Sequence, residues 1–198
     1  MKKKGGILLA LLLIGCSVFC QKPKKNTFFV PGQKKPTLFG IAFSLSDFNA
    51  PKNFGHQSNA SSLPIKNMSA GVSVSYWKPL TPMIDFSANL NGIFHDYSSI
   101  YFGTPGKTEI GLELQPTIHV RAIKDENLWS PFLTAGAGIG LYTNHVGAYI
   151  PLGGGLQFNA SNTTYIFIQA LYKISITPKV LGDNLFYSIG FAQNIKSD

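Results

Sequence analysis

Six ionisable side chains lie in segments of this sequence that otherwise consist of apolar and small residues. They are Asp85, Glu109, Glu113, His119, Arg121 and Lys173. Charges in a region of low dielectric need partners, because an unpaired buried charge is strongly unfavourable. The set contains both carboxylates and cations. It therefore predicts a polar network, with Glu113 or Asp85 paired to Arg121 or Lys173, and not a catalytic site.

A second set has the residue types needed for acid–base chemistry. It comprises His56, His95, Asp96 and His145, which lie in or near polar connections between apolar segments. A histidine beside an acid can activate a serine hydroxyl, but no serine here lies in a nucleophile motif. The glycine run in PLGGGLQF also lacks the Lys-Ser/Thr that follows a phosphate-binding loop. We expect no catalytic site and no cofactor.

An alternation of residue types indicates the elements that would position the first set. In IGLELQPTIHVRAI (110–123), even positions are apolar, and odd positions are polar, charged or glycine. This period of two is that of a β-strand, in which successive side chains point to opposite faces. Glu113, His119 and Arg121 would share one face, and Leu112 would lie on the other.

Seven further segments alternate in the same way, with turn-rich stretches between them. Each of the eight has at least ten residues, the length that a strand needs to cross a bilayer (~9–11 residues). Strands of soluble proteins most often have ~5–6 residues. The eight segments are 37–48, 68–77, 84–95, 110–123, 131–143, 148–159, 165–174 and 185–195.

The composition of the two faces predicts which of them points inward. One face carries bulky aliphatic and aromatic residues, and the other carries mainly Ser, Gly, Asn and Thr with a few charges. A soluble barrel such as a lipocalin needs large apolar residues inside, whereas a membrane barrel turns them toward lipid. We expect Glu113, His119 and Arg121 to point inward and Leu112 and Ile118 to face lipid.

The N-terminus has the parts of a secretory signal, predicted here over 1–20. Lys2 to Lys4 precede an apolar core of 8 residues, which is too short to span a bilayer. Cleavage after Cys20 is favoured, and the competing possibility is a lipobox that ends at Cys16. The favoured cleavage removes both cysteines of the chain, and with them disulfide, zinc and thiol chemistry. No metal site is expected.

Most of the charge asymmetry of the chain lies at this end. The net charge is +8, and eight lysines but no acid lie in residues 1–36, so the rest of the chain is formally neutral. That distribution argues against a nucleic-acid partner. Residues 21–36 hold five Lys and three Pro, which predicts a flexible, solvated basic leader before a barrel over 37–198.

The whole of 37–198 resembles the small eight-stranded outer-membrane β-barrels of Gram-negative bacteria, the OmpA/OmpX-like class. The resemblance rests on the signal peptide, the eight segments and strings such as FLTAGAGIGLY and LFYSIGFAQNI. It implies an all-β, eight-stranded antiparallel up-and-down transmembrane barrel in the outer membrane, with both termini periplasmic. Many members add a periplasmic peptidoglycan-binding domain, which we do not expect here because the sequence stops at Asp198. The resemblance also implies contact with outer-membrane lipid, lipopolysaccharide and the barrel-assembly machinery. Members of the class usually end on an aromatic residue, whereas this chain ends at Lys196, Ser197 and Asp198.

Within this class we expect a structural or surface-interaction role. The long connections 49–67 and 96–108 would lie outside the cell and offer surfaces for an extracellular ligand. Two alternatives remain: a soluble lipocalin-like binder of small ligands, and a lipid-modifying enzyme of the outer membrane. Pro116 and Pro151 each remove a hydrogen-bond donor from a strand, which predicts a bulge or local break at both.

Overall fold

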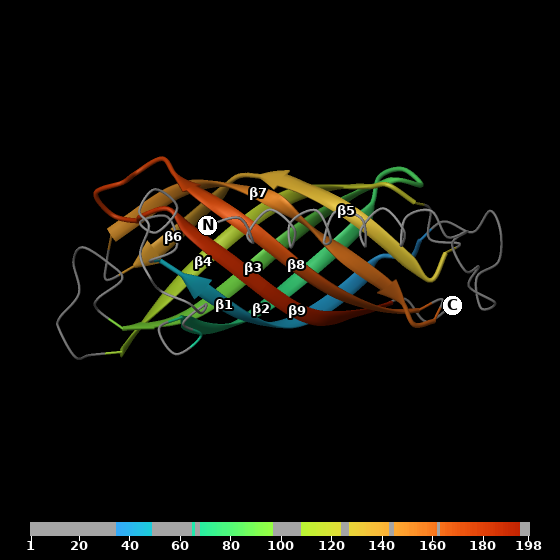
Figure 1. The fold of residues 1–198 in the computed structure, drawn as a ribbon, viewed down its shortest axis with the longest axis horizontal. Coiled ribbons are helices and arrows are strands. Elements are labelled where there is room, and N and C mark those ends of the chain that lie inside the picture. Colours follow the sequence, from blue (N-terminus) through green and yellow to red (C-terminus); the bar gives the residue numbers. More distant parts are fainter. Residues whose placement is uncertain are drawn as a thin grey trace, which may run out of the picture.

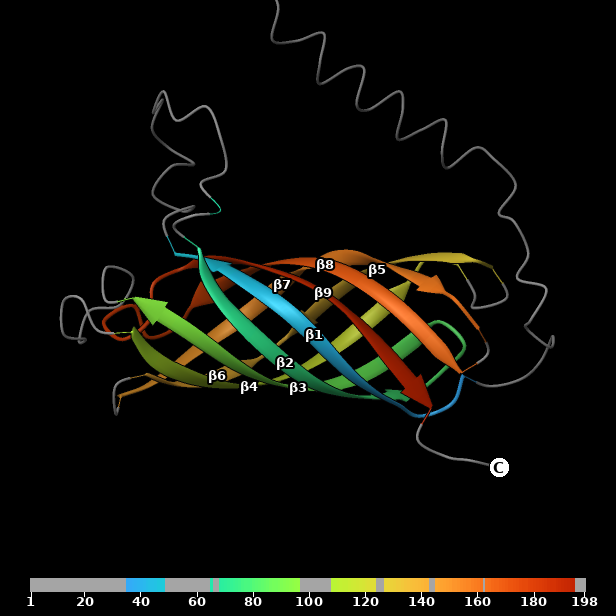
Figure 2. The ribbon, with the colours of Figure 1, turned by 90° about the horizontal axis from the view of Figure 1, so that it is seen from below.

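The structure is a computed structural model that describes residues 35–48, 65, 68–96, 108–123, 127–142, 145–161 and 163–194. Successive strands pair antiparallel, and the last strand also pairs with the first, so the sheet closes on itself (Figures 1 and 2). The described strands are β1 (Leu38–Asp47), β2 (Ser69–Pro79), β3 (Ile84–Asp96), β4 (Thr108–Arg121), β5 (Trp129–Gly136), β6 (Gly138–Tyr142), β7 (His145–Asn159), β8 (Thr164–Ser175) and β9 (Asn184–Asn194).

β5 and β6 are two parts of one barrel strand. Both lie between β4 and β7, and the register against each neighbour is the same on either side of Ala137. The barrel therefore has eight strands, and each expected segment forms one of them. The predicted fold class is confirmed.

The two prolines explain why this strand is interrupted. Continuing the register on either side places Pro116 of β4 opposite Ala137, and Pro151 of β7 opposite Gly136. The Ala137 amide donates to the Pro116 carbonyl at 3.2 Å, but neither proline has an N–H to donate in return. The prediction of a bulge or local break at Pro116 and Pro151 is wrong, and the interruption lies instead at Ala137, in the strand between them. β4 and β7 themselves continue without a bulge.

The two faces of the wall differ in chemistry. Phe39, Ile41 and Phe43 of β1 are about half exposed on the outside, whereas Ser44 and Ser46 of the same strand are buried inside. All other strands alternate in the same sense. The alternative of a lipocalin-like barrel is wrong, because the apolar faces point outward and the lumen is polar.

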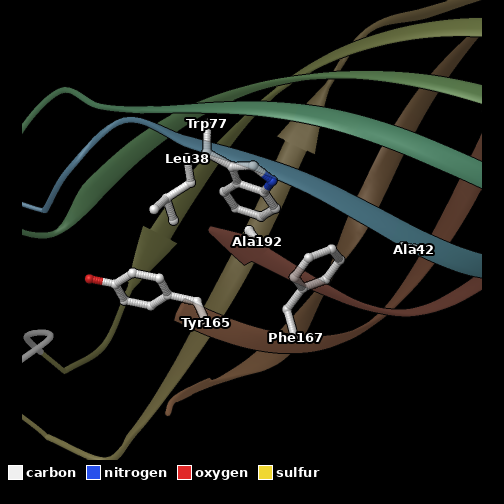
Figure 3. Packing of buried hydrophobic residues seen from close by; sticks show 6 residues of the cluster. All are labelled: Leu38, Ala42, Trp77, Tyr165, Phe167 and Ala192. Carbon is white, nitrogen blue, oxygen red and sulfur yellow. The ribbon is translucent and has the colours of Figure 1, made fainter. Parts of the chain in front are cut away.

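The lumen is nevertheless packed, and its two ends can be told apart. The end where β1 begins and β9 ends, here called the proximal end, holds an aromatic cluster (Figure 3). The opposite, distal end holds Phe48, Tyr142, Tyr149 and Leu181. Glycines make room for these rings: a Cβ on Gly138 would lie 2.2 Å from the Tyr149 ring. The proximal cluster comprises Leu38, Ala42, Trp77, Tyr165, Phe167 and Ala192.

Several predictions fall on residues outside the described ranges. These are the signal peptide with Cys16 and Cys20, the leader up to residue 34, the C-terminal residues 195–198, and most of the connections 49–67 and 96–108. Among the described residues, no helix has the length and apolar character to cross a membrane.

Candidate functional site: the polar lumen

Period-two alternation brings polar side chains from every barrel strand into one enclosed space. Arg121, Lys173 and His119 are among the largest side chains that are completely buried. A narrow eight-stranded barrel has room for side chains and little else. The polar lumen is therefore the candidate site, and its charges gather into two clusters.

The proximal charge cluster is centred on Asp85 of β3. Arg121 of β4 approaches both carboxylate oxygens, with Nε 3.2 Å from Oδ2 and an N–H of NH2 donated to Oδ1 at 3.2 Å. The same guanidinium donates to the Pro82 carbonyl at 3.0 Å. Lys35 Nζ lies 2.9 Å from Asp85 Oδ2 and 2.8 Å from Gln157 Oε1. One buried carboxylate thus receives hydrogen bonds from two cations.

The position of Lys35 corrects the sequence analysis. The prediction that 21–36 is a solvated leader is wrong for this residue, whose side chain is 2% exposed inside the barrel. Lys35 precedes the alternating segment, so the period of two assigns it no face. The one local signal is Pro36, which favours an extended backbone at the residue before it but does not say where the side chain points.

His119 of β4 is the cross-strand partner of Asp85 and lies between hydroxyl groups and aromatic rings. Its Nε2 is 2.8 Å from Ser87 Oγ, and its Nδ1 is 2.8 Å from Thr134 Oγ1. Trp77 stacks on the imidazole at 4.3 Å, and Phe132 meets it edge-on at 5.2 Å. Catalytic Ser-His pairs need a third group, usually a carboxylate, on the second nitrogen. Here that partner is a threonine, and Ser87 is fully buried.

The distal charge cluster is centred on Glu113 of β4. Lys173 of β8 donates to Oε2 at 2.5 Å, and both side chains have no exposed surface. The Tyr142 hydroxyl donates to Oε1, and the Tyr149 hydroxyl donates to Oε2 at 3.0 Å. The Asn91 amide adds a further bond at 3.1 Å. The carboxylate is thus surrounded by one cation and three neutral donors.

The connection between β8 and β9 folds over the distal end. The Ala148 amide donates to Thr177 Oγ1 at 2.9 Å, and the Ser175 amide donates to Asp183 Oδ1 at 2.8 Å. These bonds hold the connection against the end of the barrel. Its Leu181 is fully buried and packs with the aromatic rings whose hydroxyls contact Glu113. An apolar cap therefore covers the distal cluster.

The structure brings together four of the six residues singled out first, as the pairs Asp85–Arg121 and Glu113–Lys173. His119 lies inside the lumen with hydroxyl partners. Glu109 lies on the inward face of β4 near its distal end and is half-buried.

The second set of residues forms no described site. His145 is exposed at the start of β7. His95 and Asp96 end β3, and His56 lies outside the described residues. Over the described ranges, no three His, Cys, Asp or Glu side chains are grouped to hold a metal ion.

A closed eight-stranded antiparallel barrel with an apolar exterior and a polar lumen is the fold of the small outer-membrane β-barrels. The solved structures similar to this chain include the following two. One is the N-terminal β-barrel domain of Pseudomonas aeruginosa OprF, with a TM-score of 0.53 and 11% identity over 81% of this chain and 98% of that chain. The other is Neisserial surface protein A (NspA), with a TM-score of 0.53 and 10% identity over 80% of this chain and 97% of that chain.

Comparisons at the level of sequence add nothing to this likeness. No protein-family model matches the chain, and no curated protein matches it.

Proposed function

We propose that this protein is an integral β-barrel of the outer membrane of a Gram-negative bacterium, with a structural or surface-interaction role and no catalytic activity. The observation that carries the proposal is the inverted wall: large apolar side chains point outward from every barrel strand. Water would make that exterior strongly unfavourable, whereas lipid tails match it. A closed sheet also leaves no unpaired strand edge in the bilayer.

The orientation follows from the predicted signal peptide. Export would leave the N-terminus in the periplasm, and β1 and β9 place both ends of the barrel chain at the proximal end. The proximal charge cluster would then face the periplasm. The connections 49–67 and 96–108 would face the exterior, where they would meet lipopolysaccharide and an extracellular ligand.

The filled lumen supports a role other than transport through an open pore. Side chains of the two charge clusters and the apolar cap occupy both ends. We expect the purified barrel to show no steady conductance in a planar bilayer. A stable open state of the unmodified protein would contradict this expectation.

The arrangement around His119 also argues against the lipid-modifying alternative. Its partners on both ring nitrogens are hydroxyl groups, and the imidazole is shielded by Trp77 and Phe132. A lipid substrate would need access to this site from the bilayer or the membrane surface. The described barrel wall is closed around it.

Heat-modifiability of the membrane fraction tests the proposal. The protein is extracted from outer membranes with detergent and run on a denaturing gel with and without boiling. A folded barrel retains its hydrogen-bonded sheet in detergent, so we expect two mobilities and co-fractionation with the outer membrane. A single mobility together with recovery in the soluble periplasmic fraction would refute the membrane assignment.

A further inference from the structure

We propose that the proximal end of the lumen is a binding site for a primary alkylammonium group, and that Lys35 occupies this site in cis. The inference goes beyond the proposed function. It rests on the geometry inside the barrel and not on the membrane in which the barrel lies.

The groups around Lys35 Nζ are those that recognise an ammonium ion. The Asp85 carboxylate and the Gln157 amide oxygen accept its N–H groups at 2.9 and 2.8 Å. Two aromatic faces complete the surroundings, with Nζ 4.9 Å from the centre of the Tyr165 ring and 5.7 Å from that of Trp77. Anionic, carbonyl and aromatic groups around one nitrogen combine charge-assisted hydrogen bonds with cation–π attraction.

The barrel holds the anionic part of this site in place without help from Lys35. Asp85 also accepts a hydrogen bond on Oδ1 from Arg121, whose Nε lies 3.2 Å from Oδ2 and which donates to the Pro82 carbonyl as well. The carboxylate therefore keeps its orientation and a counter-charge when Lys35 is absent. Removing this one cation does not leave a bare charge in the lumen.

The neutral members are also held by neighbours other than Lys35. Gln157 donates to Asn159 Oδ1 at 2.6 Å, which orients the amide so that its oxygen faces the ammonium. Trp77 donates from its indole to Ser75 Oγ at 2.8 Å and stacks on His119. Figure 3 shows Trp77 and Tyr165 projecting from different strands, and Lys35 Nζ lies 5.7 and 4.9 Å from their ring centres. The site is thus built by the barrel before its occupant arrives.

Lys35 differs from the other members because it lies outside the strands. It precedes β1, whereas its partners belong to β2, β3, β7 and β8. Its flexible four-carbon side chain delivers a compact point charge. The guanidinium of Arg121 already approaches both carboxylate oxygens, and the remaining cation at the carboxylate is an ammonium group on an aliphatic chain. If Lys35 leaves, the site is open to an ammonium from a free amine or from a peptide lysine.

Chemical rescue of Lys35→Ala in the detergent-solubilised full-length barrel tests the proposal. n-Butylammonium carries the charge of the lysine side chain on four carbons, one more than the three that Lys35→Ala removes. In a Trp129→Phe background, Trp77 is the one remaining tryptophan of the chain, and its emission reports directly on the site. We expect n-butylammonium to change this emission saturably in Lys35→Ala and to restore much of the heat-modification temperature that the variant loses.

Three controls give the experiment its specificity. Lys78→Ala removes an exposed lysine next to Trp77 on β2, and neither this variant nor the unmodified barrel should respond to the amine. n-Butanol and n-butylguanidinium, at matched ionic strength, should not replace the ammonium. Adding Gln157→Leu to Lys35→Ala should weaken the saturable response at least several-fold. This variant keeps Asp85, so Arg121 retains its carboxylate partner.

The outcomes separate the ligand sources and can overturn the proposal. A saturable response to n-butylammonium and to Nα-acetyl-lysine amide, which keeps a free ε-ammonium, supports a site that also accepts peptide lysines. A response to n-butylammonium alone supports a site for small free amines. No saturable response in Lys35→Ala, or an equal response in Lys78→Ala, would overturn the proposal.

Discussion

At the distal end the anion Glu113 and the cation Lys173 both belong to barrel strands, whereas at the proximal end Asp85 meets one cation from β4 and another from the segment before β1. Each carboxylate is buried and hydrogen-bonded. The two clusters differ in the number of cations, because Asp85 is paired with two and Glu113 with one. Loss of Lys173 leaves Glu113 with neutral donors, but loss of Lys35 leaves Asp85 paired with Arg121. A cluster with two cations can release one of them, and a cluster with one cation cannot.

The strongest test of this comparison is Lys173→Met. The substitution leaves Glu113 as a buried charge without a cation, which we expect to lower the free energy of unfolding by about 3–5 kcal/mol. Urea titration of the barrel in detergent or lipid measures the change. The double variant Lys173→Met with Glu113→Gln serves as the control and should recover much of the loss. If the double variant is no more stable than the single one, the ion pair is not the cause.

The apolar cap at the distal end is the next largest contribution that we expect. Leu181 is fully buried against Tyr142 and Tyr149. Leu181→Ala should cost about 2–4 kcal/mol through lost packing and the cavity left behind. The exposed neighbour Lys179 provides a matched control in the same connection. Equal unfolding midpoints for Leu181→Ala and Lys179→Ala would show that the cap adds nothing to stability.

Redundancy at the proximal end predicts a smaller effect for Arg121→Met. Because Lys35 still bonds to Asp85, we expect a loss of only about 1–3 kcal/mol. Combining Arg121→Met with Lys35→Ala removes both cations, and the loss should exceed the sum of the two single losses. Denaturant unfolding of the four proteins in this cycle gives the coupling. An unchanged midpoint in Arg121→Met, or strict additivity in the cycle, would contradict the description of a shared carboxylate.

The smallest expected effect concerns hydroxyls that belong to neither cluster. Within the part of the chain that the structure describes, Ser188 Oγ on β9 is buried without a hydrogen-bond partner, whereas Ser87 Oγ bonds to Thr117 and His119. Ser87→Ala should cost about 1–2 kcal/mol, and Ser188→Ala should lie within about 0.5 kcal/mol of the unmodified barrel. Unfolding midpoints of the two variants, measured side by side, decide this. A larger loss in Ser188→Ala would mean that burial, and not bonding, sets the contribution of a lumen hydroxyl.

The sequence by itself determined the eight strands, the antiparallel order and the face on which each residue lies. Alternation is a local property, because each backbone unit turns the next side chain to the opposite face. Leu112 and Glu113 therefore lie on opposite faces whatever the rest of the chain does, and the bulky composition of one face predicted that it points outward. The same reasoning placed Asp85, Arg121 and Lys173 in one lumen.

Only the tertiary structure decided which of these charges meet. Contacts across the lumen depend on strand tilt and on the stagger at which the barrel closes, and the period of two contains neither quantity. That is why Glu113 pairs with Lys173, 60 residues away, and why Leu181 caps the same cluster. Lys35 lies before the first alternating segment, so the alternation did not predict where its side chain points. Its place in the lumen depends on Asp85 and Gln157, which the fold brings to the same end of the barrel.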